Sequence, residues 1–80
     1  MYSSIFNRFR ILIAEVANVR RYVITTNTYF ETDLGMTKEN LAELKLRTEN
    51  EFDIKLPENI FKEFDTVGEI VGFIESELGR

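Results

Sequence analysis

The sequence predicts an all-α fold, namely a four-helix bundle with a long first loop and a short third helix. Three stretches of the 80 residues place apolar side chains every three or four positions, as one buried face of a helix requires. A fourth stretch begins at Pro57, and proline suits the first turn of a helix. No second segment alternates like a strand, so we expect a single helical domain over residues 1–80.

The first helix is predicted over about residues 4–18. A hydroxyl of Ser3 or Ser4 can cap its start, because it accepts a hydrogen bond from a free amide of the first turn. The apolar residues of its expected buried face are Ile5, Phe6, Phe9, Leu12, Ile13, Val16 and Val19.

Residues 20–32 are ambiguous. The run from Tyr22 to Thr26 is rich in β-branched residues and has the propensity of a strand. Because no partner strand is expected, we interpret the segment as a long ordered loop. It is expected to be held to the core by Val23, Tyr29 and Phe30.

The second helix is predicted from about Lys38 to Glu51, with Thr37 as its N-cap. Its expected buried face is Leu41, Leu44, Thr48 and Phe52. A short third helix is predicted over residues 57–64, with Phe61 and Phe64 directed inward.

The last helix is predicted to begin after a cap at Asp65 or Thr66 and to end near Gly79. Gly68 and Gly72 lie one turn apart inside it. Each glycine costs about 1 kcal/mol of helix stability relative to alanine. The pair therefore indicates either close approach of another element or simply a weak helix. The expected core residues are Val67, Ile70, Val71, Ile74 and Leu78.

The composition excludes several classes of function. The chain has no Cys and no His, so it lacks disulfides, thiolate catalysis, cysteine metal sites and the usual neutral-pH base. Its longest apolar run, Ile11 to Ala14, is far shorter than the roughly 20 residues that span a bilayer. We therefore expect a cytoplasmic protein without membrane insertion.

Charge is distributed unevenly along the chain. The net charge is −4, but residues 1–30 carry four arginines against one glutamate, whereas residues 31–80 carry thirteen acids against six bases. An acidic second half favours a basic protein partner and repels nucleic acid. The four arginines are too scattered in sequence to define a binding patch, so nucleic-acid binding is not expected.

From Tyr29 to Leu78 the sequence resembles acyl carrier proteins without a gap. The segment 29–35 is similar to the end of the first loop in that family, and 51–57 is similar to the exit of its second helix. Residues 65–67 and 73–74 are similar to the last helix. The resemblance implies a four-helix bundle with a short third helix, in agreement with the helical pattern.

The resemblance fails at the attachment site for phosphopantetheine. In the family an Asp-Ser-Leu triplet follows Asp-Leu-Gly by one residue, and the serine carries the prosthetic group. Here the three positions are Thr37, Lys38 and Glu39. Thr37 can still cap the helix, but Lys38 has no hydroxyl and is expected to be a solvated lysine rather than a nucleophile. No phosphopantetheine or other cofactor is therefore predicted.

Other hydroxyl groups are weaker candidates for attachment. Thr37 lies one residue before the serine position and its hydroxyl is a secondary alcohol. Its oxygen is also expected to be engaged in capping. Ser3, Ser4 and Ser76 lie outside the matched motif.

The second helix is also where the resemblance places partner binding. Leu46 points about 140° away from Leu41 by helical geometry, which turns it outward. Single exposed apolar residues are ordinary, but this position matches the outward apolar residue of the family's recognition helix. Arg47 and Lys45 replace apolar residues there, which predicts a changed set of partners. The expected partner-contact residues are Leu46, Glu43, Glu49, Lys45 and Met36.

These observations support one leading function and leave others open. The leading hypothesis is a monomeric carrier-like module that regulates or scaffolds an acyl-transfer or other enzyme system by binding a protein, an enzyme being the expected partner. The alternative is an atypical carrier in fatty-acid, lipid or secondary-metabolite biosynthesis, loaded through Thr37 or holding acyl chains noncovalently. Catalysis is not expected, because Glu49, Glu51 and Asp53 fit neither an acid–base pair nor a calcium loop.

The family's core can open around an acyl chain. Five phenylalanines in inward patterns are expected to fill that volume here, which predicts a core without a lipid cavity. They are Phe30, Phe52, Phe61, Phe64 and Phe73.

Overall fold

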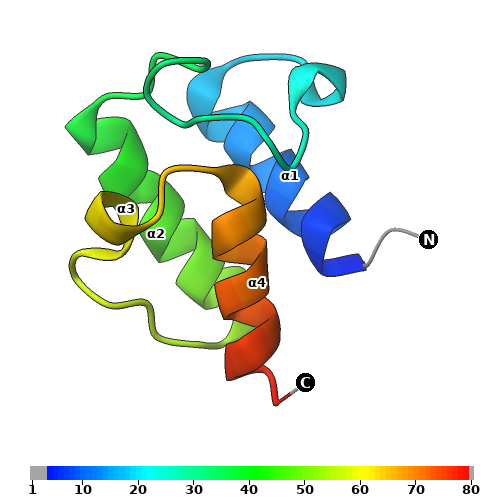
Figure 1. Cartoon of the computed structure of the whole chain (residues 1–80), viewed down its shortest axis with the longest axis vertical. Helices are drawn as coiled ribbons and strands as arrows, with labels where there is room; N and C mark the ends of the chain where they lie inside the picture. Colours follow the sequence, from blue (N-terminus) through cyan, green and yellow to red (C-terminus); the bar gives the residue numbers. More distant parts are fainter. Residues whose placement is uncertain (1–3, 80) are drawn as a thin grey trace.

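The computed structural model describes residues 4–79, and its regular elements are all helices, as the sequence predicts (Figure 1). Helix α1 contacts both α2 and α4, and the single-turn α3 lies beside α2 (Figure 1). Residues 4–79 form no strand, and their one isolated β-bridge joins Tyr29 to Thr66. The elements are α1 Ser4–Ala17, the 3₁₀ turn η1 Arg21–Val23, α2 Lys38–Phe52, α3 Ile60–Glu63 and α4 Val67–Glu77.

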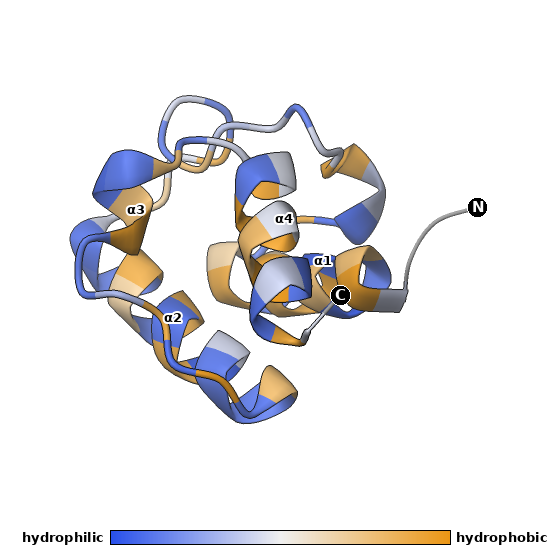
Figure 2. Cartoon of the chain, turned by 60° about the horizontal axis from the view of Figure 1, so that its bottom comes forward, coloured by the Kyte–Doolittle hydropathy of each residue, from blue (hydrophilic) through white to orange (hydrophobic). Residues whose placement is uncertain are grey.

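Each helix has apolar and polar residues along its length (Figure 2), as helices with one buried side require. The apolar core draws on all the helices and on both long connections. Its buried members are Phe6, Phe9, Ile13, Ile24, Phe30, Met36, Leu41, Leu44, Phe52, Leu56, Ile60, Val67, Ile70, Val71 and Ile74.

Helix α1 ends one residue earlier than expected, because Asn18 adopts a left-handed conformation with φ of 59°. Its most buried side chains are Phe6, Phe9 and Ile13. The other expected residues of this face are only partly buried, so the centre of the buried stripe is shifted toward Phe6 and Ile13. Ser4 is the first helical residue, and Ser3 lies outside the described residues.

The first loop is ordered, but two of its three expected anchors are wrong. Val23 and Tyr29 are each 47 % exposed, whereas Phe30 is buried as expected. The missed anchor is Ile24, which is fully buried. The cause is the 3₁₀ turn η1, which replaces strand-like alternation with three residues per turn and directs Val23 outward.

The first loop is hydrogen-bonded to the start of α4. The Gly68 amide donates to the Thr26 carbonyl at 2.8 Å, and the Val67 amide donates to the Thr28 carbonyl at 3.0 Å. A Cβ on Gly68 would lie 2.9 Å from the Thr26 oxygen, but a Cβ on Gly72 would have no neighbour within 4 Å. Close approach therefore explains Gly68 and not Gly72.

Helix α2 confirms the sequence-based prediction of its buried face. Leu41, Leu44, Thr48 and Phe52 are all buried. The buried Thr48 hydroxyl donates to the Leu44 carbonyl at 2.7 Å, so its polar group has a partner. The helix runs one residue further than expected and ends at Asp53, whose φ is 55°.

Helix α3 is shorter than predicted. Residues 57–59 form a turn in which the Ile60 amide donates to the Pro57 carbonyl at 3.1 Å, and the helix itself has four residues. Its inward residue is Ile60, while Phe61 and Phe64 are only partly buried. Proline here starts a turn, and no side chain caps the helix after it.

Candidate functional site at the start of α2

The turn before α2 explains the Asp-Leu-Gly triplet physically. The Asp33 carboxylate accepts a hydrogen bond from the Tyr29 amide at 2.8 Å, which closes the turn. Gly35 has φ of 63°, a conformation that favours glycine, and its amide donates to the Glu31 carbonyl at 2.9 Å. The turn thereby fixes where α2 begins.

Met36 follows this turn and belongs to the core. Its side chain is 5 % exposed, and its amide donates to the Phe30 carbonyl at 3.1 Å. We therefore leave Met36 out of the partner surface on which the sequence had placed it. Its burial also anchors the residue immediately before the α2 cap.

Thr37 caps α2 through a reciprocal pair of hydrogen bonds. Its hydroxyl oxygen accepts from the Asn40 amide at 3.1 Å, and the Asn40 side-chain oxygen accepts from the Thr37 amide at 3.0 Å. The sequence predicted the cap but not the role of Asn40, although a polar side chain three residues after a threonine is the signal of this arrangement. The Thr37 oxygen is thus engaged in capping.

Lys38 is exposed at the first helical position. It lines a surface hollow of about 390 Å³ between α2 and α3, together with Leu41, Lys45 and Phe61. Its ammonium group lies at the positive end of the helix, an unfavourable place that Glu39 in the same turn offsets. No hydroxyl is present at this position.

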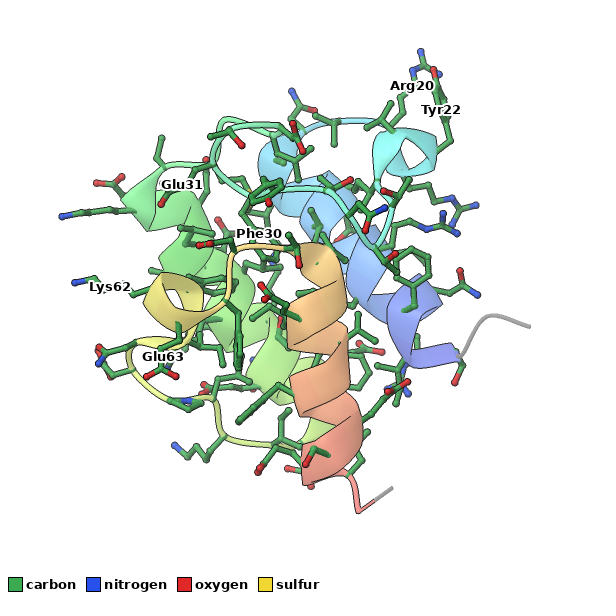
Figure 3. All side chains as sticks on the ribbon, in the orientation of Figure 1. Arg20, Tyr22, Phe30, Glu31, Lys62 and Glu63 are labelled. Carbon is green, nitrogen blue, oxygen red and sulfur yellow. The ribbon has the colours of Figure 1, made fainter. Side chains whose placement is uncertain are left out.

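A second hollow of about 480 Å³ adjoins the first between the first loop, α2 and α3. Phe30 forms part of its wall, and Glu31 and Lys62 lie at its outer side (Figure 3). The prediction of a filled core did not anticipate these hollows. Phe61 lines both hollows and is only partly buried. Phe64 and Phe73 are also only partly buried, whereas Phe30 and Phe52 are inside the core.

Leu46 is the large apolar side chain that α2 exposes, as predicted, with 61 % of its surface accessible. Glu43, the nearby acid on α2, is paired within the chain. Arg47 donates to Glu43 at 2.8 Å and to Glu15 of α1 at 3.0 Å. This α2 surface therefore offers less negative charge than the sequence suggests.

Glu49 has a structural role that the sequence did not reveal. Its side chain is 14 % exposed, and its carboxylate accepts from the Leu56 amide at 2.8 Å and from the Lys45 ammonium at 3.3 Å. The Leu56 amide, followed by Lys45, lowers the pKa of Glu49. Glu49 and Lys45 thus hold the connection after α2 and are not free contacts.

The last acid of α2 is also paired. Arg8 of α1 donates to the Glu51 carboxylate at 2.9 Å and lies 4.5 Å from the centre of the Phe52 ring. Within residues 4–79, Glu39 is the α2 acid that has no ion-pair partner. Negative charge available to a partner is therefore concentrated at the start of the helix, beside Lys38.

The described residues restrict other kinds of site. Within positions 4–79 no three acidic side chains are arranged to hold a metal ion. No helix in the same part of the chain combines the length and apolar character needed to cross a membrane.

The chain matches known proteins along most of its length. A family model described as "Phosphopantetheine attachment site" matches residues 7–74. The chain is 39 % identical over 75 residues to an acyl carrier protein of Borreliella burgdorferi, covering 94 % of each chain. It is 37 % identical, with the same coverage, to acyl carrier proteins of Borrelia garinii and Lactobacillus acidophilus.

Proposed function

Because the chain belongs to the acyl carrier protein family, we propose that it is a carrier-like binding module that is not loaded with phosphopantetheine. It would act through protein–protein contacts, as a regulator or scaffold of an acyl-transfer or other enzyme system. We further propose that it works as a monomer in the cytoplasm. The observation that carries the proposal is the exposed Lys38 at the position that matches the family's attachment serine.

The local geometry supports the absence of an attachment point. Attack on the pyrophosphate of coenzyme A requires a hydroxyl that can be deprotonated. Lys38 offers an ammonium instead. The neighbouring Thr37 oxygen accepts from the Asn40 amide, so moving it toward a transferase would remove the α2 cap at a cost of about 1 kcal/mol.

Partner binding is assigned to the outward side of α2. Leu46 provides an exposed apolar centre, and Glu39 provides an unpaired charge about two turns earlier. Glu43 faces solvent but shares its charge with Arg47. A partner that relies on a strongly basic patch would gain little from this surface, because most of its acids are already paired.

Intact-protein mass spectrometry tests the missing attachment directly. The chain is incubated with coenzyme A and a broad-specificity phosphopantetheinyl transferase, alongside the Borreliella burgdorferi acyl carrier protein as a positive control. We expect added mass on the control and none on this chain. Added mass at any residue of this chain would disprove the proposal.

A Lys38→Ser variant separates loss of the nucleophile from loss of recognition. Modification of this variant would mean that the transferase still binds the α2 surface and that the hydroxyl alone is missing. No modification would mean that the surrounding surface has diverged as well. A Lys38→Ala variant is the matched control, because it removes the ammonium without adding a hydroxyl.

An atypical carrier remains the second candidate, and the hollow of about 480 Å³ favours it. Phe30, Leu41 and Phe61 form an apolar part of its wall that a hydrocarbon chain could contact, beside the charged Glu31, Lys62 and Asp65. Native mass spectrometry of the purified chain distinguishes the two functions. Copurified acyl species that disappear in a Leu41→Trp variant would favour the carrier role over the binding module.

A further inference from the structure

The 3₁₀ turn η1 exposes the most accessible large apolar side chain of residues 4–79. Tyr22 is 73 % exposed, which exceeds the value for Leu46 on α2, and Val23 beside it is 47 % exposed. Arg20 and Tyr22 both project away from the helices (Figure 3). The sequence had placed Val23 in the core, so this surface was not expected.

The turn that presents these side chains is held firmly by the backbone. The Val23 amide donates to the Arg20 carbonyl and the Ile24 amide to the Arg21 carbonyl, each at 3.1 Å. Ile24 is fully buried immediately after the turn. A partner would therefore meet a preformed backbone, and the entropy cost of binding would fall on the side chains.

Arg20 and Arg21 carry charge that the rest of the described chain does not neutralise. Both are exposed, and neither has an ion-pair partner within residues 4–79. Arg8 and Arg47, by contrast, are paired with glutamates. Arg10 lies 4.8 Å from the centre of the Phe6 ring and donates to the side chain of Asn7.

We propose that Arg20, Arg21, Tyr22 and Val23, here called the η1 surface, dock an acidic segment of a protein partner. Guanidinium groups bind carboxylates through two hydrogen bonds at once, and tyrosine supplies a large, stiff apolar contact. Arginine and tyrosine are also enriched at the energetic centres of protein interfaces. The partner segment would combine carboxylates with an aromatic or aliphatic side chain.

The charges of the chain argue against a membrane, nucleic acid or a second copy as the ligand of the η1 surface. Two basic side chains contribute only about 2 kcal/mol at an anionic membrane, and the whole chain carries −4. Nucleic acid would meet two arginines on a chain whose residues 31–80 repel phosphate. A second copy would have to bind head to tail through its acidic half, and sedimentation tests that case.

The test uses the full chain labelled with ¹⁵N and a synthetic ten-residue peptide of alternating glutamate and phenylalanine. We expect saturable amide shift changes confined to residues 19–24. An Arg20→Glu, Arg21→Glu double variant should weaken binding by about tenfold or more, because two attractive charge contacts become repulsive. Tyr22→Ala should weaken it by about fivefold or more.

Lys55→Glu is the matched control, because it reverses an exposed charge on the opposite connection. It should change the affinity by less than about twofold, and thermal unfolding should show that all variants fold. The proposal is overturned if the peptide does not saturate, if the shifts map to α2, or if Lys55→Glu weakens binding equally. Concentration-dependent self-association that the double variant abolishes, or equal binding to phosphatidylserine vesicles, would also overturn it.

Discussion

Helices α2 and α4 begin with the same capping arrangement in different surroundings. Thr66 accepts from the Glu69 amide while the Glu69 carboxylate accepts from the Thr66 amide, as Thr37 and Asn40 do at α2. At α4 the next two amides donate to the first loop, and Val67 is buried. At α2 the next residue is Lys38, which is exposed.

The difference separates what the fold requires from what a site requires. The cap satisfies free amides at both helices, so it is needed whether or not chemistry takes place there. The residue after the cap is fixed by packing at α4 but is open to solvent at α2. A side chain at position 38 can therefore change without disturbing the bundle.

The largest expected effect is at the covered end of α4. Gly68→Ala would bring a Cβ to 2.9 Å from the Thr26 oxygen, which belongs to the backbone and can give way only if the loop shifts. We expect the free energy of unfolding to fall by about 1–3 kcal/mol in urea titrations.

Gly72→Ala is the matched control in the same helix. Its Cβ would meet nothing within 4 Å, so the substitution should raise the free energy of unfolding by about 0.5–1 kcal/mol. Equal effects of the two substitutions would mean that the loop does not pack on Gly68 as described.

Removing each cap hydroxyl tests whether the capping arrangements of α2 and α4 are equivalent. Thr37→Ala and Thr66→Ala should each lower the free energy of unfolding by about 1 kcal/mol. The Thr66 variant should lose more, because Val67 beside it is packed under the first loop. Serine replacements keep the acceptor oxygen and should stay close to the parent. A larger loss at Thr37 would reverse the comparison.

Lowering the pH should reduce the stability contributed by the α4 cap but not that contributed by the α2 cap. The amides of Asp65 and Thr66 hold the pKa of Glu69 below its ordinary value of 4.5. Because the folded state favours the ionised carboxylate, its stabilisation is complete above about pH 4.5 and is lost as the pH falls through the lowered pKa. Glu69→Gln should therefore make the acid loss of stability less steep in urea titrations from pH 7 to 2.

Asn40→Asp is the converse substitution at α2. The side-chain amide of Asn40 does not titrate. An aspartate there would accept from the same Thr37 backbone amide, and its protonation would add a new loss of stability on acidification. Glu49 also has a lowered pKa and sets a background slope that both variants share. Unchanged acid profiles in both variants would contradict the assigned hydrogen bonds.

The smallest expected effect is at the open end of α2. Lys38→Ser or Lys38→Ala should change the free energy of unfolding by less than about 0.5 kcal/mol, because surface substitutions away from packing contacts have little effect. Thermal unfolding followed by circular dichroism measures this change. A loss above that range would show that Lys38 supports the fold.

Helical periodicity accounts for most of the fold that could be predicted. Spacing alone identified Leu41, Leu44, Thr48 and Phe52 as the buried face of α2, because a long helix repeats its pattern. The predictions failed at Val23, which was expected to anchor a loop, and at Phe61, which was expected to face inward from a short helix. Both lie in turns of three or four residues, which are too short to show a period and are set by contacts with the rest of the chain.

The candidate site was predictable in part for a similar reason. The capping role of Thr37 and the exposure of Leu46 depend on neighbours within one helix. The role of Glu49 depends on Leu56, which a left-handed turn at Asp53 brings back to the helix, and the pairing of Arg47 depends on α1. Such contacts between distant segments leave no local signal in the sequence.

The ion pairs of α1 hold it to α2 more firmly than α3 is held. Arg8 and Glu15 tie α1 to α2, whereas α3 consists of four residues and has no capping side chain. Transient loosening should therefore begin at α3, and its amides should exchange with deuterium sooner than those of α2. A molecule that enters the hollows beside α3 would therefore do so from the α3 side of the bundle.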